Sequence, residues 1–358
     1  MLSSGVGSWS AVAMGIDLLV LGGTSWLGGK VARLALARGH RVTCLARGKS
    51  GSVPDGAQWV PADRSDVGAY AGVTGRAWDA TIDVTRQPTH ARSALTALAS
   101  QSAHWIYVSS CSVYADDSTP DTDETAPLRE PWAGSGEASA EEYGPAKSAC
   151  ETAFQEVVPS GQLLVARAGL IVGHGDLSDR FGYWPGRLAR AGDSPRVLVP
   201  PQDSAVQVID AVDLASWLVD AAELGTAGIC NAVGDQVTLR EVLFRCARAC
   251  QAEPTLVEAD QAWLVQHEVS PWAGPESLPL WLPLPEYTGF MSRRNEAAKR
   301  SGLRFRPLAD TVRDALAWER ELGLPRDRGA GLSSRRETEL LETLSGHRQP
   351  FVYKATSS

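Results

Sequence analysis

A serine, a tyrosine and a lysine have the types and spacing needed to move a proton at a substrate oxygen. Tyr143 and Lys147 lie four residues apart, so a helix places both on one face, one turn apart. A tyrosine with its ordinary pKa of about 10 is a poor base at neutral pH, but a nearby ammonium group favours the phenolate. Ser110, at the end of a predicted strand, can hydrogen-bond the same oxygen. We predict a proton relay at a carbinol or carbonyl carbon; the alternative is a surface Tyr–Lys pair.

A glycine turn at residues 22–29 is the element that must bring a second reactant to this relay. A buried strand is predicted at 16–21, a helix at 30–38 and another strand at 40–47. In such a βαβ unit the backbone approaches the pyrophosphate of a dinucleotide, which the helix N-terminus attracts. The predicted contacts are Gly22, Thr24, Ser25, Trp26, Leu27 and Gly28. Ser25 replaces the middle glycine and either donates to phosphate or caps the helix. The alternative is an ordinary strand-to-helix connection.

Strands and helices continue to alternate along the first 170 residues. Strands are predicted at 58–63, 78–84, 104–110 and 163–167, and helices opening at 63–66 and spanning 89–100 and 143–157. This alternation predicts an α/β fold: a Rossmann-type, doubly wound parallel sheet with a smaller C-terminal substrate domain. Ligands bind at the carboxyl ends of the strands of such sheets. Further cofactor contacts are therefore predicted at Arg47, Asp63, Asp83, Val84 and Ser109.

Composition divides the chain into four parts. We expect a disordered extension at 1–14, a dinucleotide-binding core at 15–170 with return segments near 205–235, a mainly substrate-binding region at 171–330, and a peripheral helix and tail at 331–358. Residues 116–142 are rich in acidic, small and hydroxyl side chains, which predicts a long functional loop.

Charge and composition exclude several classes of protein. The net charge of −8 argues against a nucleic-acid binder, and no apolar run approaches the length of a membrane span. Six cysteines lie on apolar patterns without metal-ligand spacing, so we expect reduced thiols in a cytoplasmic protein and no metal site. The expected partner is a small-molecule substrate, and the protein is expected to be a monomer or a homodimer.

These motifs resemble those of the extended short-chain dehydrogenase/reductases, or NAD-dependent epimerase/dehydratase-like proteins, over about residues 15–325. The similarity is carried by residues 22–28, 109–114, 143–147 and 207–213. It implies that Ser110 and Tyr143 are catalytic and that Lys147 also binds the nicotinamide ribose. It further implies that Asp63 contacts the adenine amino group.

One departure from the family pattern bears on the substrate. Leu170 stands where the family's nucleotide-sugar enzymes carry an asparagine near the substrate diphosphate, so we predict that a nucleotide diphosphate sugar is not the natural substrate. The predicted substrate contacts are Ser112, Arg180, Phe181, Tyr183 and Trp184, with the aromatic rings as a stacking surface and Arg180 as a charged anchor. The alternative for the aromatic residues is packing onto the core. His174 is either an extra acid/base group or a structural loop residue.

The end of the second strand predicts the choice of cofactor. NAD sites usually have an acidic residue about 20 residues after the glycines, whereas Arg47 stands at this strand end. Because an arginine can pair with a 2′-phosphate, we predict NADP, with NAD as the alternative.

Three functions remain open on the sequence alone. The first is an NAD(P)-dependent oxidoreductase with an exchangeable cofactor, which the absence of an obvious clamp over the adenosine half favours. The second is an epimerase or dehydratase of a sugar or sugar-like substrate that keeps its cofactor bound. The third is a dinucleotide-binding sensor without turnover, against which the intact Ser–Tyr–Lys set argues.

Overall fold

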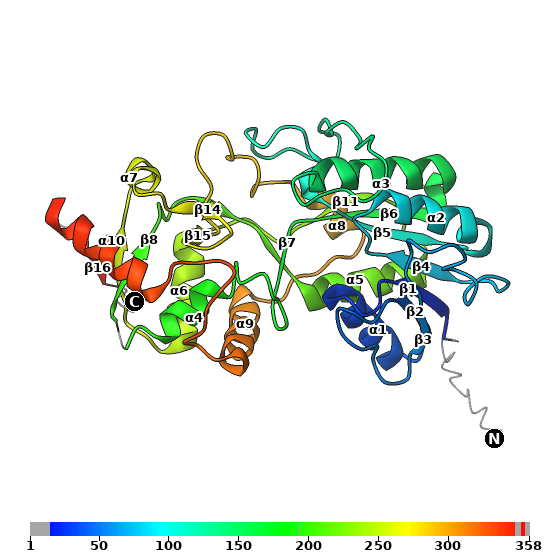
Figure 1. Cartoon of the computed structure of the whole chain (residues 1–358), viewed down its shortest axis with the longest axis horizontal. Coiled ribbons are helices and arrows are strands. Elements are labelled where there is room, and N and C mark those ends of the chain that lie inside the picture. The colour runs from blue at the N-terminus through cyan, green and yellow to red at the C-terminus, as the bar shows by residue number, and fades with distance from the viewer. Residues whose placement is uncertain (1–14, 193, 348–351, 355–358) are drawn as a thin grey trace, which may run out of the picture.

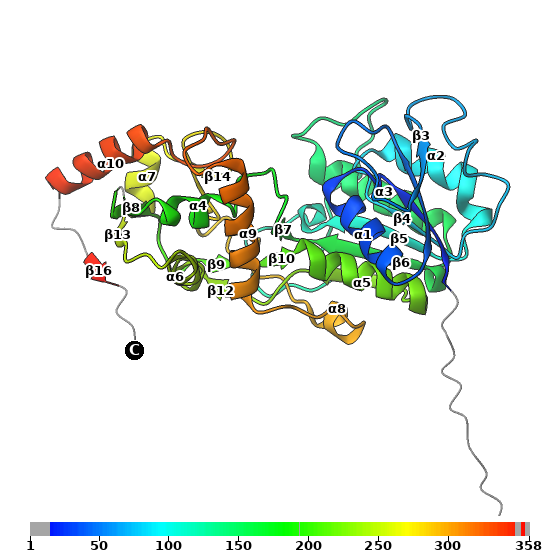
Figure 2. The same cartoon turned by 90° about the horizontal axis from the view of Figure 1, so that it is seen from below.

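The chain folds into two lobes, seen side by side in Figure 1 and from below in Figure 2. The computed structural model describes residues 15–192, 194–347 and 352–354, and the expectation for residues 1–14 lies outside this part of the chain. No helix within these ranges is both long enough and apolar enough to cross a membrane.

The N-terminal lobe is built on a seven-stranded sheet in which every strand pair is parallel, in the order β11-β6-β5-β4-β1-β2-β3. Its strands are β1 (Asp17–Leu21), β2 (Arg41–Ala46), β3 (Gln58–Pro61), β4 (Ala80–Asp83), β5 (Trp105–Ser110), β6 (Leu163–Ala168) and β11 (Gly228–Ala232). This order confirms the predicted doubly wound sheet, whose strand order reverses between β1 and β4.

Helices cover both faces of this sheet. They are α1 (Trp26–Ala37), α2 (Pro88–Leu98), α3 (Tyr143–Val157), α5 (Ala211–Leu224) and α8 (Glu296–Arg300). Helices α1 and α5 lie below the sheet in Figure 1, and α2 and α3 lie above it. Each face has its own apolar core, one shared with α1 and α5 and the other with α2 and α3. Strands β1, β4, β5 and β6 are almost entirely buried, which explains their near-continuous apolar sequences, whereas the edge strand β3 is largely exposed.

Helix α1 begins at Trp26, four residues before its predicted start at residue 30. Ser25 is its N-cap residue, and its Oγ accepts a hydrogen bond from the backbone N–H of Gly28 at 3.2 Å. Gly28 and Gly29, which were predicted to belong to the turn, therefore lie inside the first turn of the helix, where the cap compensates for their low helix propensity.

The helix predicted to open at residues 63–66 is wrong, because the connection from β3 to β4 is made of turns. Asp63 Oδ1 accepts a hydrogen bond from the backbone N–H of Ser65, a local turn that competes with helix formation. Gly68 and Gly75 then adopt φ values of +81° and +80°, which a helix does not contain.

The C-terminal lobe collects short strands and helices around one large apolar core. Its elements are β7 (Leu170–Val172), α4 (Tyr183–Ala189), β8 (Arg196–Val199), β9 (Ala205–Val206), β10 (Val208–Asp210), β12 (Val237–Thr238), α6 (Leu239–Cys250), β13 (Thr255–Glu258), α7 (Gln261–Gln266), β14 (Ser270–Trp272), β15 (Ser277–Pro279), α9 (Leu308–Leu322), α10 (Ser334–His347) and β16 (Val352–Lys354). Helix α10, expected to be peripheral, places Leu340 and Leu341 in this core, and its Glu337 pairs with buried Arg187.

Candidate active site

Helix α3 positions Tyr143 and Lys147 on the sheet's carboxyl edge. Tyr143 is its first residue, and Lys147, one turn later, is only 3 % exposed. The Lys147 ammonium donates to the backbone carbonyls of Thr85, at 2.7 Å, and Val108, at 2.6 Å. Its Nζ lies 6.0 Å from the centre of the Tyr143 ring. The lysine is thus fixed between the ends of β4 and β5, with its charge beneath the tyrosine.

Ser110 is brought to the same place by a close contact between α3 and the turn after β5. A Cβ atom on Gly144 would lie 2.4 Å from the Ser112 carbonyl oxygen, so only glycine permits this approach beside Tyr143. Ser110 Oγ accepts from the Ser112 backbone N–H at 3.1 Å and donates to Ser112 Oγ at 3.2 Å. Both serines and Tyr143 line one cavity of about 300 Å³.

The opposite wall of this cavity comes from the C-terminal lobe. Arg180, Trp272, Phe290 and Met291 lie there, and Leu170 closes one side. The Arg180 guanidinium stacks over the Trp272 ring at 5.1 Å, and its burial lowers the pKa of this group below the usual value for arginine. The cavity therefore combines aromatic surface with one positive charge opposite the Ser110 and Tyr143 hydroxyls.

The aromatic residues predicted to form this wall lie elsewhere. Phe181, Tyr183 and Trp184 are fully buried in the C-terminal core and are not among the described residues that line the cavity. Trp184 donates its indole N–H to the Pro279 carbonyl at 2.9 Å, so its polar atom is also used in packing. These residues pack in the core, which was the alternative interpretation of their aromatic side chains. His174 pairs with Glu321 at 3.0 Å on the surface, away from the cavity lining.

A second cavity, of about 180 Å³, follows the glycine turn. It is lined by six of the predicted cofactor contacts, Gly22, Thr24, Ser25, Arg47, Asp63 and Val84. Arg47 is about half exposed and lies 3.5 Å from the Asp63 carboxylate. Sequence reasoning missed Lys49 and His90, which line the same cavity. Lys49 stands in the polar loop after β2, where its proximity to Arg47 was the available signal.

The residues around this second cavity fit a dinucleotide. Gly22 has a φ of +96°, and a Cβ there would lie 2.6 Å from a Val84 methyl carbon. A Cβ on Gly28 would lie 2.3 Å from the Gly22 carbonyl oxygen. Glycine at these positions keeps the turn tight and its backbone accessible at the positive end of α1, which suits a pyrophosphate.

Four predicted cofactor contacts direct their side chains away from the cavity. The Asp83 carboxylate is fully buried and receives two hydrogen bonds from Arg64, at 2.6 and 2.8 Å. Ser109 donates to Glu151 at 2.5 Å. Leu27 packs in the core, and the Trp26 indole donates to the His174 carbonyl at 3.0 Å. A contact from these four positions to a cofactor thus remains a prediction for their backbone atoms.

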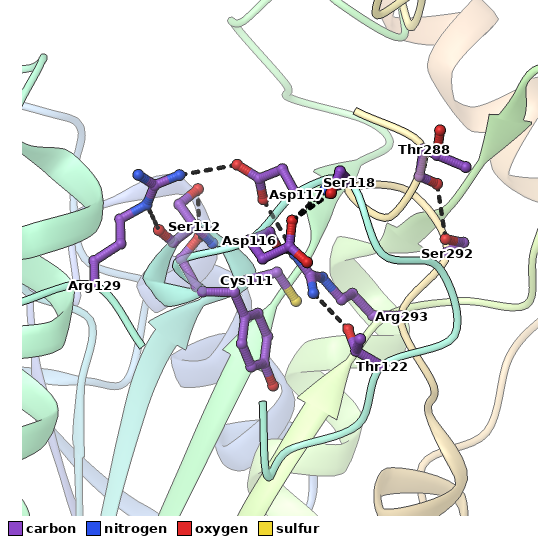
Figure 3. Close-up of polar contacts among 12 residues, drawn as sticks. Cys111, Ser112, Asp116, Asp117, Ser118, Thr122, Arg129, Thr288, Ser292 and Arg293 are labelled. Atoms are coloured by element: carbon purple, nitrogen blue, oxygen red, sulfur yellow. Dashed lines mark hydrogen bonds and ion pairs between the residues drawn. The ribbon is translucent and has the colours of Figure 1, made fainter. Parts of the chain in front are cut away.

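A polar network ties the turn after β5 to the segment before α8 (Figure 3). Arg129 donates to the Ser112 carbonyl at 3.1 Å and to the Asp117 carboxylate at 2.9 Å. Arg293, from the segment before α8, reaches the same carboxylate at 3.1 Å. Burial raises the pKa of Asp117 above its usual value, against the opposing charges of these two arginines. The network fixes the long loop beside Ser110 and explains why its polar composition is compatible with an ordered structure.

The sheet order, the glycine turn at a helix N-terminus and the Ser–Tyr–Lys set together define a Rossmann-fold enzyme of the short-chain dehydrogenase/reductase type. A family model agrees: the NAD dependent epimerase/dehydratase family matches residues 18–231, which is more than half of the chain. The chain belongs to this family and uses a nicotinamide dinucleotide. No curated protein sequence matches it.

Many solved structures share the fold. WbmH of Bordetella bronchiseptica, in complex with NAD⁺, is 16% identical with a TM-score of 0.63, covering 86% of this chain and 99% of its own. WbmG of the same organism, in complex with NAD and UDP, is 15% identical with a TM-score of 0.62, covering 87% and 96%. The UDP-glucose 4-epimerase of Thermus thermophilus, in complex with NAD, is 17% identical with a TM-score of 0.60, covering 85% and 99%. At these identities the likeness shows the fold alone.

Proposed function

We propose that the protein is an NADP-dependent oxidoreductase that transfers hydride reversibly at a secondary alcohol or ketone. One observation carries the proposal: Ser110 and Tyr143 line one cavity, and the Lys147 ammonium lies beneath Tyr143. The bound nicotinamide supplies or accepts the hydride. Tyr143 gives its hydroxyl proton to the substrate oxygen in reduction and takes it back in oxidation. Ser110 orients this oxygen, and Lys147 stabilises the negative charge that develops on the Tyr143 oxygen.

The deletion of one hydroxyl group tests this assignment. Tyr143→Phe keeps the ring, so fold and cofactor binding should survive, while turnover of a ketone panel should fall about 10²–10⁴-fold because the proton donor is lost. Loss of NADPH absorbance measures turnover, and titration measures cofactor binding. Tyr287→Phe is the matched control, because Tyr287 is exposed on the C-terminal lobe outside both cavities. A Tyr143→Phe rate above about a tenth of the wild-type rate would remove Tyr143 from the mechanism.

The choice of NADP over NAD is supported by the cations around the second cavity. Arg47 and Lys49 line it at the end of β2, where an NAD site usually has a carboxylate for the ribose 2′-hydroxyl. A 2′-phosphate would receive charge-assisted hydrogen bonds from both side chains. Asp63, 3.5 Å from Arg47, is assigned to the adenine amino group.

The substrate we propose has a planar or apolar part and one anionic or oxygen-rich group. Trp272 and Phe290 offer the stacking surface, and Arg180 offers the positive charge. Leu170 lines this cavity with an apolar side chain, which argues against a nucleotide diphosphate in its vicinity. Micromolar binding of any nucleotide diphosphate sugar would contradict this assignment.

Epimerisation with a retained cofactor is the second candidate, and the Trp26 contact favours it. The Trp26 indole donates to the His174 carbonyl, so the glycine turn is joined to the segment after β7 in the other lobe. Such a contact can slow cofactor release. Absorbance after extensive dialysis, followed by an assay without added cofactor, separates the two functions. A cofactor-free protein supports the oxidoreductase. Stoichiometric bound dinucleotide, together with turnover when no cofactor is added, supports the epimerase.

We also propose a cytoplasmic location and a monomer or homodimer. The location is supported by six free thiols, as a reducing compartment would maintain them.

A further inference from the structure

The C-terminal lobe contains a hollow that neither cofactor nor substrate explains. Its volume is about 500 Å³, and its lining includes Arg190, Glu276, Arg326, Arg328, Ser333 and Ser334. None of these described residues lines either of the cavities assigned above. The hollow lies between the end of α4, the turn joining β14 to β15, and the segment that leads into α10.

Three arginines in this hollow have unused hydrogen-bond donors. The Arg328 side chain is only 6 % exposed, and its Nη2 pairs with Glu319 at 2.5 Å. Its Nε and Nη1, however, have no partner among the described residues, and the same holds for the Nε atoms of Arg190 and Arg326. Buried donors in native proteins are almost always satisfied by protein groups, ordered water or a ligand, so four unpartnered guanidinium nitrogens at one hollow mark it as a place where polar atoms bind.

The acidic groups behind these arginines are already paired. Glu319 is fully buried and binds both Arg326 and Arg328. Asp179 binds Arg326 and accepts from the Gly329 backbone N–H at 2.7 Å. Arg190, by contrast, has only the neutral Ser334 hydroxyl as a side-chain partner among the described residues, at 2.9 Å. Its positive charge is therefore available to an incoming anion.

The N-terminus of α10 adds to the positive potential at the same place. Ser333 precedes this 14-residue helix, and its Oγ accepts from the Arg336 backbone N–H at 3.2 Å. Both Ser333 and Ser334 line the hollow, so the positive end of the helix dipole faces it. Such a helix start is suited to phosphate or carboxylate oxygens.

The hollow also presents one acceptor. Glu276 Oε1 accepts from Ser333 Oγ at 3.0 Å, while its buried Oε2 has no partner among the described residues. Asp327 is the other acidic residue of the lining. A bare anion would leave Glu276 Oε2 unsatisfied, whereas a ligand with a hydroxyl or amino group as well as an oxyanion would satisfy both sets of atoms.

We propose that this hollow is a second ligand site, which binds a small molecule carrying a phosphate or carboxylate group together with a hydroxyl or amino donor. The oxyanion lies against Arg190, Arg328 and the start of α10, and the donor group lies against Glu276. The site is independent of the proposed reaction.

Three probes test the site: inorganic phosphate, glycerol phosphate and citrate, each titrated at constant ionic strength. Thermal unfolding and isothermal calorimetry of the wild-type protein should show saturable binding of at least one hydroxyl-bearing probe, more tightly than of inorganic phosphate. Because one charge-assisted contact is lost, Arg190→Gln should weaken this binding at least about tenfold. Arg313→Gln is the matched control, since it removes the same charge from the exposed surface of α9 and should leave binding unchanged.

Two further variants keep the test decisive. If Arg190→Gln fails to fold, Arg190→Lys retains the charge but lacks Nε, and it should still weaken binding relative to Arg313→Gln. Arg47→Ala monitors phosphate binding at the dinucleotide site and should leave the calorimetric signal of the hollow intact. Absence of saturable binding by all three probes, binding equal in the Arg190 and Arg313 variants, or binding lost in Arg47→Ala alone would each overturn the proposal.

Discussion

Replacing Lys147 by methionine separates its structural role from its chemical role. Methionine keeps the apolar stem but removes the ammonium that donates to the Val108 and Thr85 carbonyls. Val108 O would lose this donor, whereas Thr85 O would keep the Tyr107 hydroxyl at 3.3 Å. Since a buried group left without its partner costs about 1–3 kcal/mol, we expect the free energy of unfolding to fall by about 2 kcal/mol.

The same substitution should slow catalysis by an amount that follows from the charge separation. Two unit charges at 6.0 Å, the distance from Lys147 Nζ to the Tyr143 ring centre, interact by about 3 kcal/mol at an effective dielectric constant of about 20. If this attraction is gained only as the Tyr143 oxygen becomes charged, its loss lowers kcat about 100-fold.

Urea unfolding followed by tryptophan fluorescence measures the first effect, and steady-state kinetics with a ketone substrate measures the second. Lys299→Met is the control, because Lys299 pairs with Asp235 at the surface and should contribute less than about 1 kcal/mol. Stability unchanged within about 0.5 kcal/mol would refute the account of the two carbonyl contacts. A kcat within about threefold of wild type would refute the electrostatic account.

Three other substitutions give separate tests. Arg47→Ala should weaken NADP binding at least about tenfold and NAD binding much less, because only NADP carries the 2′-phosphate; equal losses in parallel titrations would contradict this. Trp272→Ala should raise KM about tenfold with kcat nearly kept, and an unchanged KM in steady-state kinetics would remove Trp272 from the substrate wall. Burial, assisted by the charge of Arg64, lowers the pKa of His90, so below about pH 6.5 the unfolded chain binds a proton before the native protein does and stability falls. His90→Asn should reduce this loss in denaturant titrations, and an unchanged pH dependence would contradict it.

The sheet and the relay were predictable because their signals are local. Most of the parallel strands are short apolar runs next to a helix, and α3 was predicted with its observed bounds, Tyr143–Val157. The spacing of Tyr143 and Lys147 fixes their relative position within a single helical turn. The glycine turn was also predictable, because the residues that form it are neighbours in sequence.

The substrate wall was not predictable in the same way, because it depends on contacts between distant segments. Phe181 to Trp184 and Trp272 have the same apolar, aromatic character in sequence, yet only Trp272 lines the cavity. Which aromatic residue is exposed depends on how α4 packs against β15 and α9, and no local pattern encodes this. The helix expected near residue 63 failed for a related reason, since a hydrogen bond from Ser65 to Asp63 outweighed weak helix propensity.

The position of β11 has a consequence for the order in which the protein is made. This strand pairs with the outer edge of β6, with Gly228 opposite Leu164 and Ala232 opposite Ala168. A ribosome that has just completed β6 must therefore add about 60 more residues, including β7 to β10 and α4 of the other lobe, before that edge is covered. At about 5–20 residues per second, the edge stays open for about 3–12 s during synthesis. Exposed strand edges invite pairing with other chains, so during this interval the nascent protein is open to aggregation and a chaperone that covers the β6 edge would protect it.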